Sequence, residues 1–125
     1  MAAKVVTGDA FAADKRIEHI DLLKIDVEGM EEAVLTGFGD MLARNDISLV
    51  QFEYGRVNIV NHFLLRDFYA FFRERGYVVG KIFPNYVEFR DYDLMDEDFL
   101  GPNYLACAED MVELRQALAG VPGAR

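Results

Sequence analysis

One segment constrains the fold of this chain more than any other: an apolar run at residues 20–27, IDLLKIDV, which ends in acids. Its apolar residues do not alternate cleanly with polar ones, and this pattern predicts a strand buried on both faces of a parallel sheet. Asp26 and Glu28 close the run, and Gly29 follows directly. In open α/β sheets ligands bind beyond the carboxyl ends of the strands, so paired acids at such an end predict a functional site there.

The remaining elements follow from apolar spacings of three and four in helices and from short apolar runs between turn residues in strands. The predicted order is strand, helix, strand, helix, strand, strand and helix, at residues 20–27, 29–42, 47–54, 64–75, 77–83, 104–108 and 111–118. Residues 1–16 are expected to be an irregular lead-in with room for a short strand at 4–7, and residues 55–62 a loop. A helix joins the first two strands, which predicts a parallel pair, and a loop joins the last two, which predicts an antiparallel pair. The predicted fold class is therefore α/β, the back half of a doubly wound sheet.

The charge and the cysteine content narrow the classes of function. The 125 residues suffice for one domain with a core, and 22 acids against 13 Lys and Arg give a formal charge of -9. Such a surface repels a phosphate backbone, so nucleic acid is not expected as a partner. The single cysteine, Cys107, excludes an intrachain disulfide and a multi-cysteine zinc site, and its apolar surroundings predict a core thiol. The sequence shows neither a membrane-length apolar run nor a secretion signal, so we expect a cytoplasmic protein without a membrane partner.

Three acids are the candidate catalytic residues: Asp26, Glu28 and Glu53, the last at the carboxyl end of the segment 47–54. Neighbouring parallel strands place their ends side by side, so these carboxylates are expected to converge on one crevice. There they can take a proton from a hydroxyl, accept hydrogen bonds from a ligand, or hold a hard divalent cation. A structural alternative exists for Glu28, because an acid is stabilised at the start of a helix by the helix dipole, and Glu31 is expected to do only that.

Residues 20–38, IDLLKIDVEGMEEAVLTGF, resemble the signature of the FkbM-type S-adenosylmethionine-dependent methyltransferases. Ile20 to Gly29 match nearly throughout, and the resemblance covers most of residues 7–108. Weaker likenesses occur at Thr7-Gly8-Asp9, where Gly8 departs from the family's apolar residue, at Phe52-Glu53 and at Arg75-Gly76-Tyr77.

The resemblance implies the C-terminal half of a Rossmann-like methyltransferase domain. In that family the sheet has the strand order 3-2-1-4-5-7-6. The four predicted strands of this chain then correspond to strands 4, 5, 6 and antiparallel 7, at residues 20–27, 47–54, 77–83 and 104–108. The resemblance also implies methyl transfer from S-adenosylmethionine to a hydroxyl of a small molecule or sugar. The acid that ends the fourth strand would orient or deprotonate the acceptor.

Methyltransferases of this kind hold the cofactor with a glycine-rich loop after the first strand and an acid after the second. The sequence contains neither element, and Gly37-Phe38-Gly39 lies in or after a helix. We therefore expect residues 1–125 to be a single partial domain, a fragment or truncated product, that binds S-adenosylmethionine weakly through unknown residues. We assign no metal ligands. The alternatives are a cofactor half supplied by another chain, a noncatalytic assembly or binding module, and a small carboxylate metal site.

The resemblance leads to a prediction about assembly, because the strand that would pair with residues 20–27 is not encoded. A long apolar edge invites pairing with another chain, and identical chains most often associate with two-fold symmetry. We predict a homo-oligomer, in its simplest form a dimer, that associates through residues 20–27. The substitution Leu23→Lys is expected to weaken the contact, as measured by light scattering. A monomer at micromolar concentration with a cooperative melt would contradict the prediction.

Overall fold

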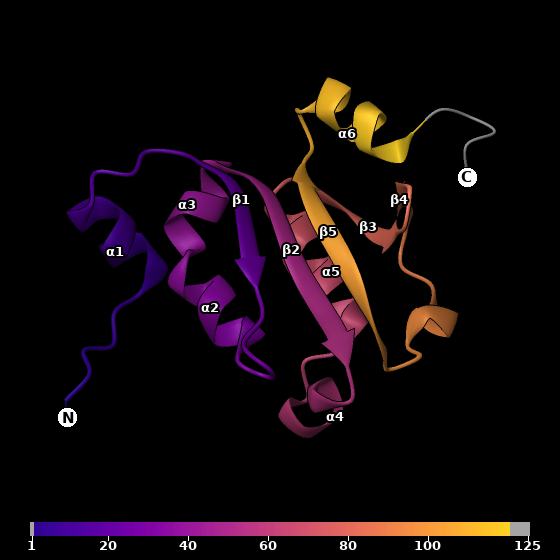
Figure 1. Ribbon diagram of the computed structural model, residues 1–125, viewed down its shortest axis with the longest axis horizontal. Coiled ribbons are helices and arrows are strands. Elements are labelled where there is room, and N and C mark those ends of the chain that lie inside the picture. The colour runs from indigo at the N-terminus through magenta and orange to yellow at the C-terminus, as the bar shows by residue number, and fades with distance from the viewer. Residues whose placement is uncertain (1, 121–125) are drawn as a thin grey trace.

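The strands form one mixed five-stranded sheet with the order β1-β2-β5-β3-β4 in the computed structural model, which describes residues 2–120 (Figure 1). The strands are β1 (Ile20–Ile25), β2 (Ile47–Gly55), β3 (Tyr77–Phe83), β4 (Tyr86–Phe89) and β5 (Leu100–Ala108). β1 and β2 are parallel, and β5 runs antiparallel to both β2 and β3. The α/β class and the predicted strand directions are thus confirmed, and the run β1-β2-β5-β3 has the order 4-5-7-6 that the resemblance implied.

Six α-helices and one 3-10 helix accompany the sheet in the described residues. They are α1 (Gly8–Asp14), α2 (Glu31–Gly37), α3 (Gly39–Ala43), α4 (Val57–Asn61), α5 (Leu65–Glu74), η1 (Leu94–Asp96) and α6 (Val112–Ala119). In Figure 1, α5 lies behind the sheet, α1 to α3 lie beside β1, and α4 lies below the end of β2. No helix within residues 2–120 has the length and apolar character that crossing a bilayer requires.

The core is built around aromatic rings that α5 and the central strands contribute. Phe52 of β2 stacks on Phe68 of α5 with the ring centroids 4.3 Å apart, and Phe72 and Tyr104 stack on Phe52 at 5.6 and 5.7 Å. All four side chains are fully buried. Phe68 and Phe72 are four residues apart, so they lie on one stripe of the helix that packs against β2 and β5. Cys107 is buried and its burial raises the pKa of the thiol, which confirms the predicted core thiol.

The N-terminal segment differs from its prediction, because residues 8–14 form α1 and residues 4–7 join no strand. Thr7 begins the helix by accepting a hydrogen bond from the Ala10 N–H at 3.1 Å. The helix packs so closely that a Cβ atom on Gly8 would overlap the ring of Phe38, with contacts of 2.3–2.5 Å. A glycine therefore stands where the resembled family has an apolar residue.

Three further predictions were wrong in detail. The helix predicted at residues 29–42 is divided into α2 and α3 at Phe38, between two glycines of low helix propensity, and the loop predicted at 55–62 contains α4. β1 is not buried on both faces, because Leu22 is 50% exposed and β1 lies at the edge of the sheet. Leu23 packs against the core, so a charge there would also disturb folding, and Leu22 is the better position for testing association. The association itself stays a prediction.

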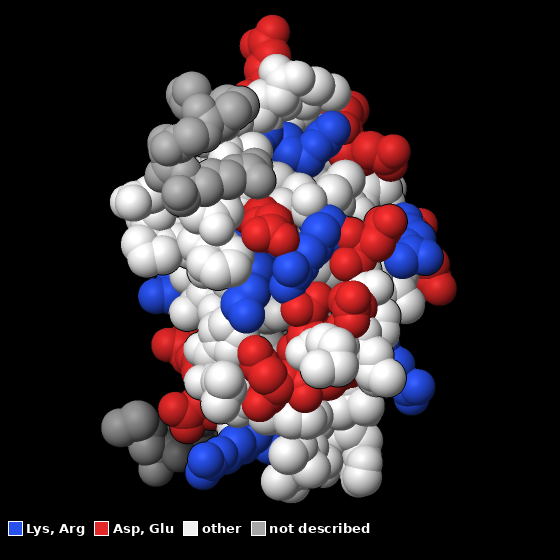
Figure 2. All heavy atoms as spheres, turned by 90° about the vertical axis from the view of Figure 1, so that its right-hand side faces the viewer, with Lys and Arg blue, Asp and Glu red and all other residues white. Residues whose placement is uncertain are grey.

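The face that carries β4 and η1 mixes charges of both signs (Figure 2). Arg90 pairs with Glu88 at 2.9 Å and also with Asp96 of η1, and Lys81 of β3 lies 3.7 Å from Asp98. These contacts join the segment before β5 to the strands at the far edge of the sheet. The acidic segment 93–98 is therefore paired with Arg90 and Lys81.

The N-terminus of α3 depends on a residue of α1. The Asp9 carboxylate accepts hydrogen bonds from the Asp40 and Met41 N–H groups at 2.8 and 3.1 Å. Loss of such a cap costs about 0.5–2 kcal/mol. We therefore expect Asp9→Ala to lower the free energy of unfolding by that amount in urea titrations. Asp14→Ala is the matched control, because the Asp14 side chain is exposed and forms a long ion pair of 3.9 Å with Lys15. Equal losses of stability in the two variants would contradict the capping role of Asp9.

Candidate functional site

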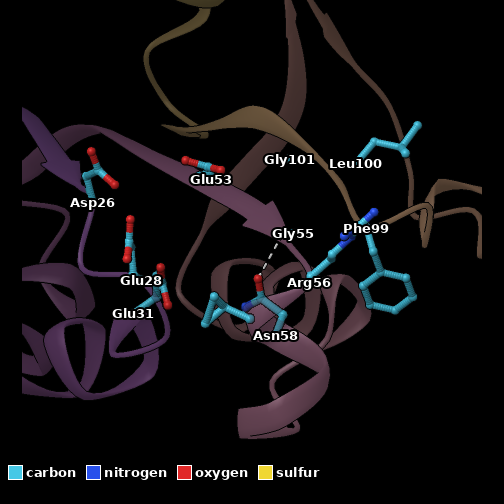
Figure 3. Close-up of a pocket in the computed structure, with 11 residues that line it drawn as sticks. Asp26, Glu28, Glu31, Glu53, Gly55, Arg56, Asn58, Phe99, Leu100 and Gly101 are labelled. Atoms are coloured by element: carbon cyan, nitrogen blue, oxygen red, sulfur yellow. Dashed lines mark hydrogen bonds between the residues drawn. The ribbon is translucent and has the colours of Figure 1, made fainter.

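A cavity of about 430 Å³ opens beyond the carboxyl ends of β1 and β2 (Figure 3). It contains all three acids that the sequence indicated, Asp26, Glu28 and Glu53. The residues that line it are Asp26, Glu28, Glu31, Glu53, Gly55, Arg56, Val57, Asn58, Phe99, Leu100 and Gly101. The predicted convergence of the three carboxylates on one crevice is therefore seen, while their catalytic role stays a prediction.

The register of β1 and β2 brings Asp26 and Glu53 together. Ile25 pairs with Phe52 in the parallel ladder; Asp26 directly follows Ile25, the last residue of β1, and Glu53 directly follows Phe52 in β2. Side chains alternate between the faces of a strand, so the burial of Phe52 and Tyr54 in the core turns Glu53 outward toward the cavity. Ile25 is likewise buried, and Asp26 is exposed at the cavity mouth.

Glu28 reaches the cavity from a tight turn that ends the β1 segment. Its φ is +44°, which is uncommon for a residue with a side chain, and Gly29 follows with φ +107°. A Cβ atom on Gly29 would lie 2.7 Å from a methyl group of Val57 in α4, so this close approach and the positive φ together favour glycine here. The turn holds Glu28 at the cavity and starts α2 two residues later.

Glu31 has a role that the sequence interpretation missed. It was expected to serve only the helix dipole, but it lines the cavity and is 4% exposed. Its carboxylate accepts a hydrogen bond from the Gly29 N–H at 2.9 Å and so stabilises the turn. An acid in the first helical turn, two residues after a glycine, can fold back to a free amide in the manner of a capping box, and this signal could have identified it.

Two asparagines of α4 tie the floor of the cavity to both strand ends. Asn58 is 2% exposed; its side-chain oxygen accepts from the Gly55 N–H at 3.0 Å and its amide donates to the Phe63 carbonyl at 3.1 Å. Asn61 donates to the Gly29 carbonyl at 2.7 Å. Sequence reasoning placed residues 55–62 in a loop and missed both side chains, because their partners are set by the fold.

The opposite wall comes from the start of β5 and is largely apolar. Phe99 packs on the ring of Tyr54 at 5.3 Å, and Leu100 is 82% exposed at the cavity mouth. Figure 3 shows the acids of the β1 side on the left, Glu53 between the walls, and Leu100 and Phe99 on the right. Arg56 is the one Lys or Arg that lines the cavity within residues 2–120. The cavity therefore has an acidic wall and an apolar wall.

The electrostatics of the cavity favour positively charged groups and hydrogen-bond donors. Four carboxylates against one guanidinium give it a negative potential, which attracts cations and repels anions. Such carboxylates can accept a hydroxyl proton when the acceptor lies within hydrogen-bond reach. Over the described residues no group of three or more His, Cys, Asp or Glu side chains is placed so that it could hold a metal ion.

Comparison with known proteins adds one finding. The family model of the methyltransferase FkbM domain matches residues 2–79. No curated protein and no solved structure matches the chain. The matched range includes β1, β2 and every acid of the cavity, and it ends before the wall at residues 99–101.

The hydrogen bonds of Asn61 lead to a test of how the cavity is held. Asn61→Ala removes the bond to Gly29 and the bond that the Phe63 N–H donates to its side-chain oxygen at 3.0 Å. We expect a loss of about 1–3 kcal/mol in the free energy of unfolding, with faster hydrogen exchange at the Glu28–Gly29 turn. Val60→Ala on the exposed side of the same helix is the control and should change stability by about 0.5 kcal/mol or less. Unchanged exchange in Asn61→Ala would show that α4 does not hold the turn.

Proposed function

Because the chain belongs to the FkbM methyltransferase domain family, we propose that it serves methyl transfer from S-adenosylmethionine to a hydroxyl group of a small-molecule or sugar acceptor. The observation that carries the proposal is the cavity at the carboxyl ends of β1 and β2. It gathers Asp26, Glu28, Glu31 and Glu53 from two adjacent parallel strands and the helix that joins them. This is the position at which open α/β sheets bind their ligands.

The side chains of the cavity fit the charged part of S-adenosylmethionine. That molecule carries positive charges on its sulfonium and ammonium groups and a negative charge on its carboxylate. The acids of the cavity suit the two cations, and Arg56 suits the carboxylate, since a guanidinium matches a carboxylate in charge and hydrogen-bond geometry. When bound, the cofactor supplies an electrophilic methyl group attached to a positively charged sulfur.

The protein's own contribution is to orient the acceptor and to hold its proton. In the proposal, Asp26 or Glu53 accepts the hydroxyl proton, while the other carboxylate accepts a hydrogen bond. The O–H bond of the acceptor breaks as an O–H bond forms on the carboxylate. The acceptor oxygen would gain the methyl group as the bond from that carbon to the sulfonium sulfur breaks, which would leave a neutral thioether. General base assistance of this kind typically contributes about a hundred- to ten-thousand-fold in rate, and correct positioning supplies much of the remainder.

The apolar wall supports an acceptor whose hydroxyl is carried on a carbon skeleton. Leu100 and Phe99 present apolar surface across the cavity from Asp26. Full burial of a leucine side chain stabilises a complex by about 1.5–3 kcal/mol relative to leaving it exposed. An acceptor placed between the walls would cover Leu100 and direct its hydroxyl toward Glu53.

The proposal predicts how the chain responds to two related ligands in an NMR titration. S-adenosylmethionine should bind with a dissociation constant above about 1 µM, because the sequence contains no glycine-rich cofactor loop, and should shift the amides of Glu28 and Gly29. S-adenosylhomocysteine, whose sulfur is neutral, should bind several-fold more weakly in this acidic cavity. Asp26→Asn should reduce the difference between the ligands, whereas Asp14→Asn on α1 should leave it unchanged.

The same titration identifies the competing function. If neither ligand shifts a cavity amide, the methyltransferase proposal fails for this chain and a noncatalytic assembly or binding module is favoured. Equal affinities for the two ligands would show that the acids do not contact the sulfonium. Binding near 1 µM would mean that a cofactor site exists without the missing loop.

A further inference from the structure

The strand pairing is irregular at the cavity. Glu53 pairs with Asn103, but Gly55 pairs with Leu100, so two steps along β2 are matched by three steps along β5. The extra residue makes a β-bulge, and Gly101 lies in it with φ +88°, a conformation that favours glycine. Bulges next to functional sites commonly redirect a side chain, which raises the question of which side chain this one directs.

The side chain next to the bulge is Glu53. A Cβ atom built on Gly101 would lie 3.3 Å from Oε1 of Glu53, closer than most such contacts, so any larger residue would displace the carboxylate or the backbone. Within residues 2–120 the Glu53 carboxylate makes no hydrogen bond or ion pair with another side chain. The Glu53 side chain is exposed, and the close approach of its Oε1 to Gly101 is the contact that limits its direction.

The backbone before the bulge is held from several sides, beginning with Glu97. One carboxylate oxygen of Glu97 accepts from the Leu65 N–H at the start of α5, and the other accepts from the Tyr92 hydroxyl, both at 2.9 Å. The segment before β5 is thereby fixed to the helix that carries the core. These bonds hold the chain in place four residues before Gly101.

The neighbours of Glu97 add anchors in other directions. Asp96 pairs with Arg90, and Asp98 lies 3.7 Å from Lys81 while accepting from the Leu100 N–H at 3.1 Å. Phe99 then adopts φ +57°, so the chain bends sharply just before the bulge. A strained backbone conformation persists only where the surrounding contacts stabilise it. Here the contacts of Asp96 and Asp98 stabilise the conformation of Phe99.

We propose that Gly101 is a positioning residue: the bulge it forms in β5 fixes the direction in which the Glu53 carboxylate enters the cavity. The inference rests on the proposed use of this cavity and assigns to Gly101 no contact with the ligand. A methyl group at this position comes too close to the Glu53 carboxylate, which must give way and so changes its direction in the cavity. The binding of a cation that Glu53 contacts is then weakened.

The test is a double-mutant cycle with trimethylsulfonium, a small cation with the charged group of the proposed cofactor. The variants are Gly101→Ala, Glu53→Gln and the double variant, and the dissociation constant is measured by NMR on the whole chain. Glu53→Gln should weaken binding by roughly two- to fivefold, the range typical of an exposed ion pair. Gly101→Ala should also weaken binding. The dissociation constant of the double variant should match that of Glu53→Gln alone.

The control is Gly39→Ala, because a Cβ atom there meets nothing within 4 Å. This variant should bind trimethylsulfonium with the same affinity as the unchanged protein. Unchanged affinity in Gly101→Ala would overturn the proposal. So would losses that multiply in the double variant, since Gly101 would then act by a route other than Glu53.

A measurement on the unsubstituted chain keeps the test valid if Gly101→Ala does not fold. Nuclear Overhauser effects between the Glu53 γ protons and the Gly101 α protons should be present, and their absence would overturn the proposal. Failure of the methyltransferase proposal gives a different result. In that case neither S-adenosylmethionine nor S-adenosylhomocysteine shifts a cavity amide, while trimethylsulfonium still shows coupling between Gly101 and Glu53.

Discussion

The parallel pairing of β1 with β2 is the constraint on which the rest of this structure depends. Ile25 opposite Phe52 fixes the level at which both strands end, and Phe52 is held by its stacking on Phe68, 4.3 Å away. With Phe52 locked in the core, the alternation of the strand places Glu53 on the opposite face of β2, from which its side chain reaches the cavity. The site is thus a consequence of core packing one residue away.

Two residues with unusual backbone conformations shape the cavity, and hydrogen bonds from neighbouring side chains stabilise both. Glu28 and Phe99, on opposite walls, both have positive φ angles, and each stands beside a glycine or an anchored acid that supports it. Strain of this kind costs about 1–3 kcal/mol per residue and is retained where the surroundings determine it. Asn61 and Glu31 supply that support at the Glu28 turn, and Glu97 supplies it before Phe99.

The two walls of the cavity differ in whether the family model covers them. The matched range, residues 2–79, contains the acidic wall, and the apolar wall at residues 99–101 lies beyond it. The acids therefore lie within the range that the family model matches. In the proposed function, the wall with Leu100 is the part that contacts the carbon skeleton of the acceptor.

The sequence alone determined the α/β class, the strand directions, the buried Cys107 and the convergence of Asp26, Glu28 and Glu53, because apolar periodicity and strand ends are local signals. The resemblance added the strand order. Only the tertiary structure decided α1 and α4, the role of Glu31 and the wall at residues 99–101. The physical reason is that these features depend on contacts between distant residues, such as Asp9 with Asp40, Gly29 with Asn61 and Leu65 with Glu97. Contacts across 31 or 32 residues leave no period in the sequence, and they form only when the sheet brings the segments together.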